Sequence, residues 1–132
     1  MEYQLNAAEF AAVTKLSAQE RYEYAIERFV DGKEIWSLRG TDGFVLATDD
    51  VGGEFAPIWP HPRVAAACAI DAWSGSTPEA IPLDKWLERW TPGLTQDGRK
   101  VGVFPVPGGQ HAVVTPEELA ADIRALDEEE NG

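Results

Sequence analysis

The sequence has a single cysteine, Cys68, so no disulfide bond can form within the chain. Nowhere do about twenty apolar residues follow one another, as a membrane-spanning helix requires, and the start of the chain holds no apolar run long enough for a signal peptide. A lone thiol within an apolar run is usually a small buried hydrophobe. We therefore expect a soluble, cytoplasmic protein with a reduced cysteine and no membrane segment.

Basic residues are scarce as well. Eleven lysines and arginines stand against 23 aspartates and glutamates, which gives a formal net charge of −12 at pH 7. This charge repels phosphate backbones and anionic lipids, so direct binding to nucleic acid or to a membrane surface is disfavoured. A basic protein partner would be attracted, although acidity is also an ordinary means of keeping a protein soluble.

The chain also lacks the patterns of the common metal and phosphate sites. Its two histidines, His61 and His111, lie far apart, whereas zinc ligands come as closely spaced pairs. Asp49, Asp50 and Glu54 surround two glycines without the spacing of an EF-hand, which is typical of a solvated hairpin turn. The glycines form neither a G-x-G-x-x-G nor a Walker loop. We predict no metal site and no cofactor.

The sequence does contain a clear succession of helix signals. Ser17 and Glu20 form a capping box, and Tyr22, Ile26 and Phe29 follow at helical spacing. Signals of the same kind predict helices that start after Ser17, Pro62, Asp84 and Thr115. Residues 1–15 have a weaker helical pattern and are predicted to be an N-terminal extension or an extra helix.

The helix that starts at Asp84 has the strongest pattern. Trp86 and Trp90 lie on its apolar stripe, so core packing is the favoured interpretation for both indoles. Thr91-Pro92-Gly93 is predicted to end this helix, because proline disfavours the helical conformation of the residue before it and glycine permits a left-handed turn.

Short apolar segments between turns predict the strands, which are residues 34–39, 44–48, 55–59, 79–82, 100–106 and 112–114. The links between the first three have hairpin length, and parallel crossovers would need a dozen or more residues each. We therefore predict an α+β fold with a mainly antiparallel sheet of about five to six strands, covered by about four helices. Residues 16–127 are predicted to form this single domain, and residues 128–132 an acidic tail.

Several segments also resemble a known family. They are SAQERYEYAIERFVDGKEIWSL from Ser17, GFVLATDD from Gly43, PIWPHPRVAAACA from Pro57 and LERWTPGLTQDGRKVGVFPVPGG from Leu87, followed by VVTPEELAADI. In these segments the chain resembles the bacterial domain-of-unknown-function family 2750 over residues 16–127. The resemblance implies a compact bacterial cytosolic domain. It supplies no catalytic residues, because the family has no established function.

His61 is the first residue that a catalytic interpretation would choose, since it lies between prolines where a strand leads into a helix. No serine or cysteine near it occupies a nucleophile elbow, and Cys68 lies within an alanine-rich helical segment. A structural role as the cap of the following helix is therefore favoured. We predict that the protein is not an enzyme.

The five tryptophans are the other conspicuous feature. Trp36, Trp59 and Trp73 are predicted at strand or helix ends, where an indole can keep its N–H in contact with water. With His61 and Arg63 they would form a partner-binding or ligand-binding surface. Core packing is the alternative for Trp59 and Trp73.

Small size, acidity and the lack of evident chemistry together favour a non-catalytic protein-binding module. An immunity protein that neutralises a basic toxin is the specific form of this hypothesis, since opposite charges accelerate encounter. The alternative is a small-ligand-binding or housekeeping domain with a pocket near Trp59, His61 and Trp73.

Overall fold

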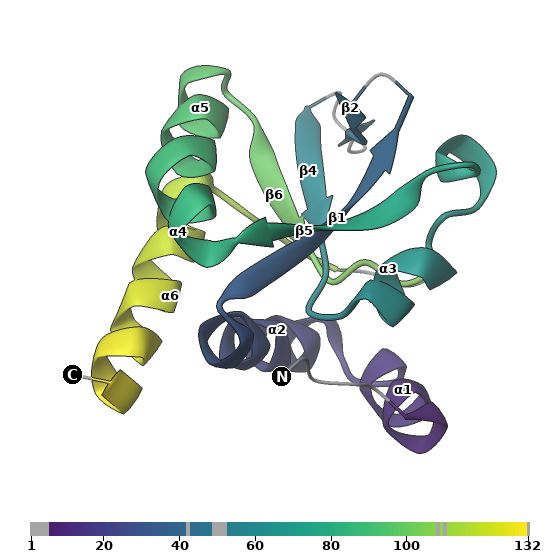
Figure 1. The fold of residues 1–132 in the computed structure, drawn as a ribbon, viewed down its shortest axis with the longest axis horizontal. Coiled ribbons are helices and arrows are strands. Elements are labelled where there is room, and N and C mark those ends of the chain that lie inside the picture. The colour runs from purple at the N-terminus through teal and green to yellow at the C-terminus, as the bar shows by residue number, and fades with distance from the viewer. Residues whose placement is uncertain (1–5, 42, 49–52, 108, 110, 132) are drawn as a thin grey trace.

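A computed structural model describes residues 6–41, 43–48, 53–107, 109 and 111–131, and its elements form the predicted α+β fold (Figure 1). The helical segments are α1 (Ala7–Thr14), α2 (Ala18–Gly32), α3 (Pro62–Ala67), η1 (Asp71–Trp73), α4 (Leu83–Lys85), η2 (Trp86–Trp90), α5 (Thr91–Gln96) and α6 (Pro116–Asn131). The strands are β1 (Glu34–Gly40), β2 (Gly43–Phe44), β3 (Ala47–Thr48), β4 (Glu54–Ile58), β5 (Thr77–Pro82), β6 (Lys100–Val103) and β7 (Ala112–Val114).

The strands form two small sheets, with orders β2-β1-β5 and β3-β4-β6-β7. All of their pairings are antiparallel except that of β4 with β6, which is parallel. Trp36 of β1 joins the sheets, because its N–H and C=O bond to the C=O and N–H of Trp59 at 3.0 and 2.8 Å. The prediction of a mainly antiparallel arrangement is confirmed, and the division into two sheets was not foreseen.

Helix α2 begins and ends as its sequence indicates. The Ser17 hydroxyl accepts a hydrogen bond from the Glu20 N–H at 3.1 Å, and the Glu20 carboxylate accepts one from the Ser17 N–H at 3.0 Å. This reciprocal box satisfies two amides that the first turn would otherwise leave unpaired. Lys33 ends the helix in a left-handed conformation, with φ of 56°. Asn6 caps α1 in a similar way, through the N–H of Glu9 at 2.8 Å.

The prediction that Thr91-Pro92-Gly93 ends the tryptophan helix is wrong. Helical backbone runs without a break through α4, η2 and α5, and η2 is a π-helix. Proline lacks an N–H and would clash with a carbonyl one turn earlier, so the wider π-turn accommodates Pro92 inside the helix. The Thr91 hydroxyl supports that turn by donating to the Trp86 carbonyl at 3.1 Å. The helix also begins at Leu83, so Asp84 lies in its first turn rather than at its cap.

One predicted strand is divided between the two sheets, and another is shorter than predicted. The predicted strand 44–48 contributes β2 to one sheet and β3 to the other. The predicted strand 100–106 stops at Val103, because Phe104 has a φ of 55° and cannot continue an extended chain. The helix predicted to start after Pro62 is short: it ends at Ala67, and Trp73 lies in the separate 3₁₀-turn η1. Helix α6, in contrast, continues through the acidic residues 128–130.

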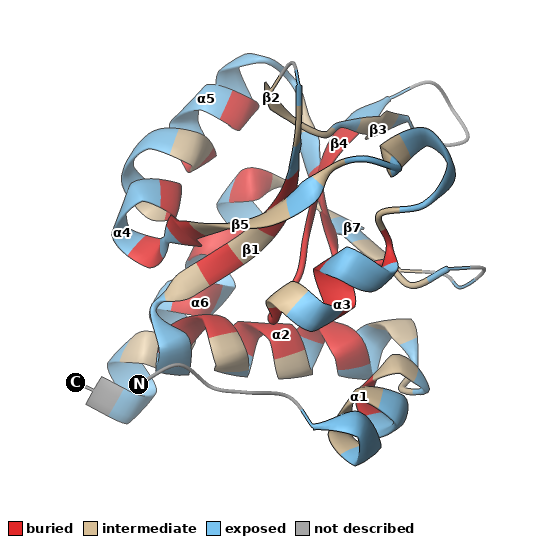
Figure 2. Ribbon diagram, turned by 45° about the vertical axis from the view of Figure 1, so that its right-hand side comes forward, coloured by how far each residue is buried: buried red, intermediate tan, exposed pale blue. Residues whose placement is uncertain are grey.

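The core lies between the sheets and the helices, and Figure 2 shows buried residues along the inward faces of α2, β1 and β4. Its largest fully buried side chains include Phe29 of α2, Trp59, Trp86 of η2 and Phe104. Helix α6 contacts both α2 and α5. Within the described residues, no helix is both long enough and apolar enough to span a membrane.

Two glycine substitutions test this packing. A Cβ atom at Gly102 of β6 would lie 2.5 Å from the buried ring of Phe55, whereas a Cβ at Gly93 of α5 would have no neighbour within 4 Å. We expect Gly102→Ala to lower the free energy of unfolding by about 1–3 kcal/mol. Gly93→Ala should raise it by about 0.5–1 kcal/mol, because alanine favours the helix.

Urea titration of the two variants beside the wild type measures both effects. A destabilising Gly93→Ala would show that residue 93 ends the helix in solution, contrary to the continuous helix described above.

Candidate functional site

Trp59 and His61, the centre of the predicted site, lie inside the protein. Trp59 is 0 % and His61 3 % exposed. The Trp59 indole donates its N–H to the Pro105 carbonyl at 2.9 Å, so the expectation of a water-exposed indole N–H is wrong for this residue. His61 occupies the N-cap position of α3, as predicted, but its side chain makes no cap bond.

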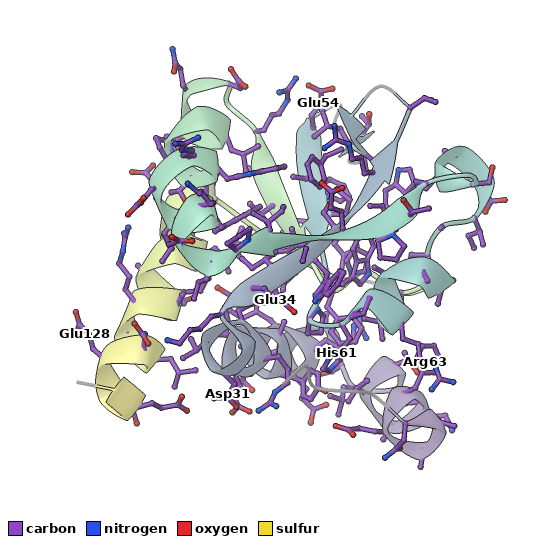
Figure 3. The ribbon with its side chains drawn as sticks, viewed as in Figure 1. Asp31, Glu34, Glu54, His61, Arg63 and Glu128 are labelled. Carbon is purple, nitrogen blue, oxygen red and sulfur yellow. The ribbon has the colours of Figure 1, made fainter. Side chains whose placement is uncertain are left out.

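His61 instead contacts α2. Its Nε2 atom lies 2.7 Å from the Tyr24 hydroxyl, and Figure 3 places the residue between α2 and α3. Burial, and secondarily the charge of Arg28, lowers the pKa of His61 to about 4. Burial, followed by the charge of Glu9, raises the pKa of Tyr24 to about 12. Both groups are therefore uncharged near pH 7.

Arg21 and Cys68 are two further buried polar side chains, and both bond to the segment that follows β6. Arg21 is 4 % exposed and donates from Nε to the Phe104 carbonyl at 3.1 Å. The Cys68 thiol donates to the Pro105 carbonyl at 3.2 Å, and burial raises its pKa. A protonated thiol is a poor nucleophile, and a histidine with a pKa near 4 is a weak base at neutral pH. The arrangement therefore favours a structural role for these side chains.

Arg63 lies on the exposed side of α3 (Figure 3). Its guanidinium is 4.8 Å from the centre of the Phe10 ring, so a cation–π contact holds α1 against α3. Phe10 also lines an apolar cleft of about 380 Å³ beneath α1, whose other walls include Val64, Cys68 and Val106. Arg63 therefore fastens the N-terminal helix.

Trp73 is half-buried and does line an open cleft. Its ring packs edge-to-face on Trp59, with centroids 5.9 Å apart and an interplanar angle of 87°. The cleft has a volume of about 450 Å³ and separates residues 72–76 from the β1–β2 hairpin, where Phe44 forms another part of its wall. Trp36 does not line it. The five predicted residues thus do not share one surface: two are buried, two are half-buried, and Arg63 is exposed.

A second concave surface was missed by sequence reasoning. It is a groove of about 550 Å³ between α2 and α6, which we call the α2–α6 groove. Tyr22 and Ile26 of α2 and Leu126 of α6 form its apolar floor. Exposed carboxylates, those of Glu23 and Glu27 on α2 and of Asp122 on α6, border it. Glu23 and Glu27 lie one helical turn apart beside the apolar stripe of α2, and this spacing can be recognised in the sequence. The sequence contains no pattern, however, that predicts the packing of α2 against α6.

The two helices are fixed to each other at this groove. The Tyr22 hydroxyl donates to Asp122 at 2.5 Å, and Tyr22 is only 9 % exposed. Burial, with a smaller contribution from Asp122, raises the pKa of Tyr22. The neutral phenol therefore remains a hydrogen-bond donor at all ordinary pH values. Among the described residues that line the groove, none is basic.

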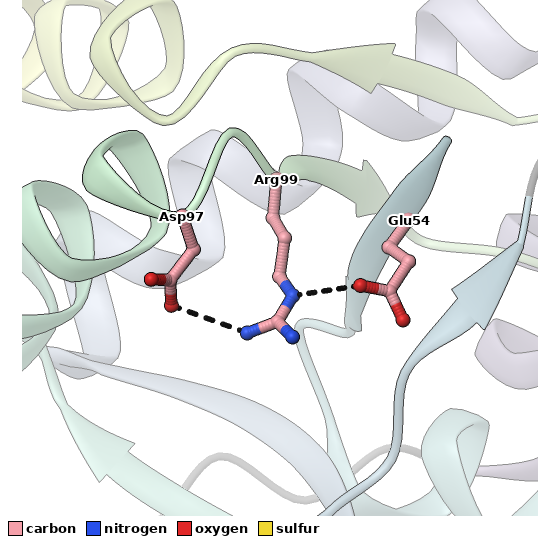
Figure 4. A network of polar contacts seen from close by, with 3 residues as sticks. All are labelled: Glu54, Asp97 and Arg99. Atoms are coloured by element: carbon pink, nitrogen blue, oxygen red, sulfur yellow. Dashed lines mark hydrogen bonds and ion pairs between the residues drawn. The ribbon is translucent and has the colours of Figure 1, made fainter. Parts of the chain in front are cut away.

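The acidic segment between β3 and β4 is a weaker candidate for a functional site. Asp49 and Asp50 lie outside the described residues. Glu54 accepts a hydrogen bond from Arg99 at 3.1 Å, and Arg99 also contacts Asp97 at 3.2 Å (Figure 4). In the part of the chain that the structure describes, no three metal-binding side chains lie close enough to hold an ion.

Comparison with known proteins agrees with the resemblance noted in the sequence. A family model described as "Protein of unknown function (DUF2750)" matches residues 22–123. None of the curated proteins matches the chain.

The buried His61 makes stability depend on pH. Below about pH 6.5 the unfolded chain binds a proton at this histidine, whereas the folded chain does so only near pH 4. Stability from this group is therefore present above about pH 6.5 and is lost as the pH falls, by about 2 kcal/mol at pH 5.

We expect His61→Gln to remove this part of the pH dependence. Urea titrations of the variant and the wild type at pH 7, 6 and 5 test it, because the carboxylates contribute equally to both proteins. If the free energy of unfolding of both proteins changes equally between pH 7 and pH 5, the pKa of His61 in the folded protein is not lowered.

Proposed function

Because the chain belongs to the DUF2750 family of proteins of unknown function, we propose its function from its own surface: it is a non-catalytic module that binds a basic protein partner. The α2–α6 groove is the single feature that carries this proposal. It combines an apolar floor with a border of carboxylates. An amphipathic helix with lysine or arginine beside its apolar stripe has the complementary pattern.

The apolar floor supplies the part of the affinity that salt does not screen. Ile26 and Tyr22 are already buried against the core, so the floor is held in place before a partner arrives. Leu126 is half-buried and can lose its remaining exposed area to an apolar side chain of the partner. Little ordering of the groove is needed on binding, which reduces the entropic cost of association.

The carboxylates supply orientation and speed of encounter. Glu23, Glu27 and Asp122 lie on both sides of the floor, and the net charge of the chain is −12. A basic partner is attracted at long range by the whole molecule and directed locally by this border. Exposed charge pairs contribute little affinity each, so the charge is expected to affect the association rate more than the final stability.

The buried polar side chains support a non-catalytic role. Burial keeps the side chains of His61, Tyr24 and Cys68 uncharged near pH 7. None of these three residues lines the α2–α6 groove. An immunity protein that neutralises a basic toxin remains the biological form of the proposal that suits small size and high negative charge. A housekeeping domain with a ligand pocket remains the alternative.

A designed peptide tests the groove directly. We expect an amphipathic helix of leucine and lysine to bind one-to-one, and Glu23→Lys to weaken it by about tenfold, because a like charge then faces the peptide. Glu88→Lys, at an exposed position of η2, changes the net charge equally but lies outside the groove, so it should have little effect.

Fluorescence anisotropy of the labelled peptide at low and high salt measures both variants, and a peptide of the same composition without the amphipathic order is the control. If Glu23→Lys and Glu88→Lys weaken peptide binding equally, the net charge of the protein explains the effect and the groove does not. If the control peptide binds as tightly as the amphipathic peptide, the apolar floor does not contribute to binding.

The immunity form requires its own test. We expect the gene beside this one to encode a basic toxin, and the two purified proteins to form a one-to-one complex that Glu23→Lys weakens and Glu88→Lys does not. Rescue of toxin-expressing cells by wild type but not by Glu23→Lys would support it. If a neighbouring toxin is inhibited equally by both variants, inhibition does not use the groove.

A further inference from the structure

The cleft between residues 72–76 and the β1–β2 hairpin differs in chemistry from the α2–α6 groove. We propose that this cleft, which we call the Trp73 cleft, binds an uncharged, planar nitrogen heterocycle of the nucleobase or nucleoside class. The inference does not depend on the proposed function, because the two surfaces have none of their described lining residues in common.

Size and aromatic lining carry the first step. The cleft has a volume of about 450 Å³, within the range of about 300–1,000 Å³ that is usual for small-ligand sites. Trp73 and Phe44 supply aromatic surface from opposite segments of its wall, and Val45 adds apolar surface. Aromatic side chains bind planar heterocycles through stacking, which is tolerant of the particular base.

Both aromatic side chains are fixed from behind. Trp73 packs edge-to-face on Trp59, whose own N–H is bonded to the Pro105 carbonyl. Phe44 packs edge-to-face on Trp90, with centroids 4.8 Å apart, and lies beneath the Arg39 guanidinium at 5.4 Å. A ligand therefore meets rings that are already ordered, and pre-ordered rings increase affinity by reducing the entropy lost on binding.

Hydroxyl and backbone groups supply the polar part of the lining. Thr41, Ser74 and Ser76 contribute hydroxyls, and Gly40 and Gly75 leave the main chain accessible to a close ligand. The Ser76 hydroxyl donates to the Trp73 carbonyl at 2.5 Å, which holds the turn that carries the indole. Such groups can pair with the ring nitrogens and exocyclic groups of a heterocycle.

Charge selects against a phosphorylated ligand. Among the described residues that line the Trp73 cleft, none is charged. The nearby Arg39 is paired with Glu79 at 3.2 Å, and the net charge of the chain is −12. Because Arg39 already shares its charge with Glu79 and the whole chain is strongly acidic, a phosphate is disfavoured here, so the free base or nucleoside is favoured over the nucleotide and over a nucleic-acid strand.

Isothermal titration calorimetry with adenosine, guanosine, cytidine and uridine tests the proposal on the full chain. We expect one-to-one binding of at least one nucleoside, and a loss of about tenfold or more in Trp73→Ala, because stacking on the indole is removed. Phe10→Ala, a half-buried aromatic outside the cleft, is the matched control and should bind as the wild type does. Ala72→Phe, at an exposed position of the cleft wall, should also abolish binding by filling the space, and it leaves Trp59 covered if Trp73→Ala fails to fold.

Each ligand series has an outcome that overturns the proposal. The 5′-monophosphates and a short single-stranded oligonucleotide should bind more weakly than the nucleosides, and equal or tighter binding would refute the uncharged class. A methyl glycoside that binds in place of the nucleosides would refute the heterocycle. Absence of nucleoside binding at millimolar concentration, or binding unchanged in both cleft variants, would refute the site itself.

Discussion

Two consecutive carbonyl groups, those of Phe104 and Pro105, accept hydrogen bonds from the side chains of three separate segments. Arg21 of α2 bonds to the first, and Trp59 and Cys68 bond to the second. The Phe104 backbone is left-handed, a conformation that costs a bulky residue of the order of 1–3 kcal/mol and persists only where its surroundings impose it. Here the surroundings do so, because the Phe104 N–H donates to the Ile58 carbonyl at 2.8 Å and its carbonyl accepts from Arg21, so both backbone groups of this buried residue are held in place. The end of β6 therefore becomes the point at which α2, the β4 to α3 junction and the C-terminal half of the chain are held together.

The same contacts connect the interior to the surface. Trp59 is fixed by its bond to Pro105, and Trp73 packs on Trp59 at the edge of an open cleft. On the other side of that cleft, Phe44 packs on Trp90, which stacks on the buried Trp86 with centroids 5.3 Å apart. Aromatic rings that face solvent are thus supported by rings in the core. The π-turn at Trp86–Trp90 belongs to this arrangement, since it places both indoles on one side of a helix that contains a proline.

The α2–α6 groove and the Trp73 cleft differ in electrostatic character. The α2–α6 groove is bordered by carboxylates on exposed helix faces, where water screens each charge but the set of charges directs a cation. The Trp73 cleft is uncharged among its described residues and depends on aromatic and hydroxyl groups. One surface therefore suits a basic macromolecule and the other a neutral small molecule, so the two proposals can succeed or fail independently.

Local patterns in the sequence were sufficient to predict the fold class, the family, and the elements whose signals lie within a few residues. The Ser17–Glu20 capping box and the apolar stripe of α2 are examples, because caps and helical spacing act over one or two turns. Which side chains meet in space could not be predicted in this way. The burial of His61 and Trp59, the continuation of the helix through Pro92, the left-handed Phe104 and the pairing of α2 with α6 all depend on contacts between residues far apart in the chain. Local patterns carry no information about such contacts, since each is stabilised by groups that arrive from another element.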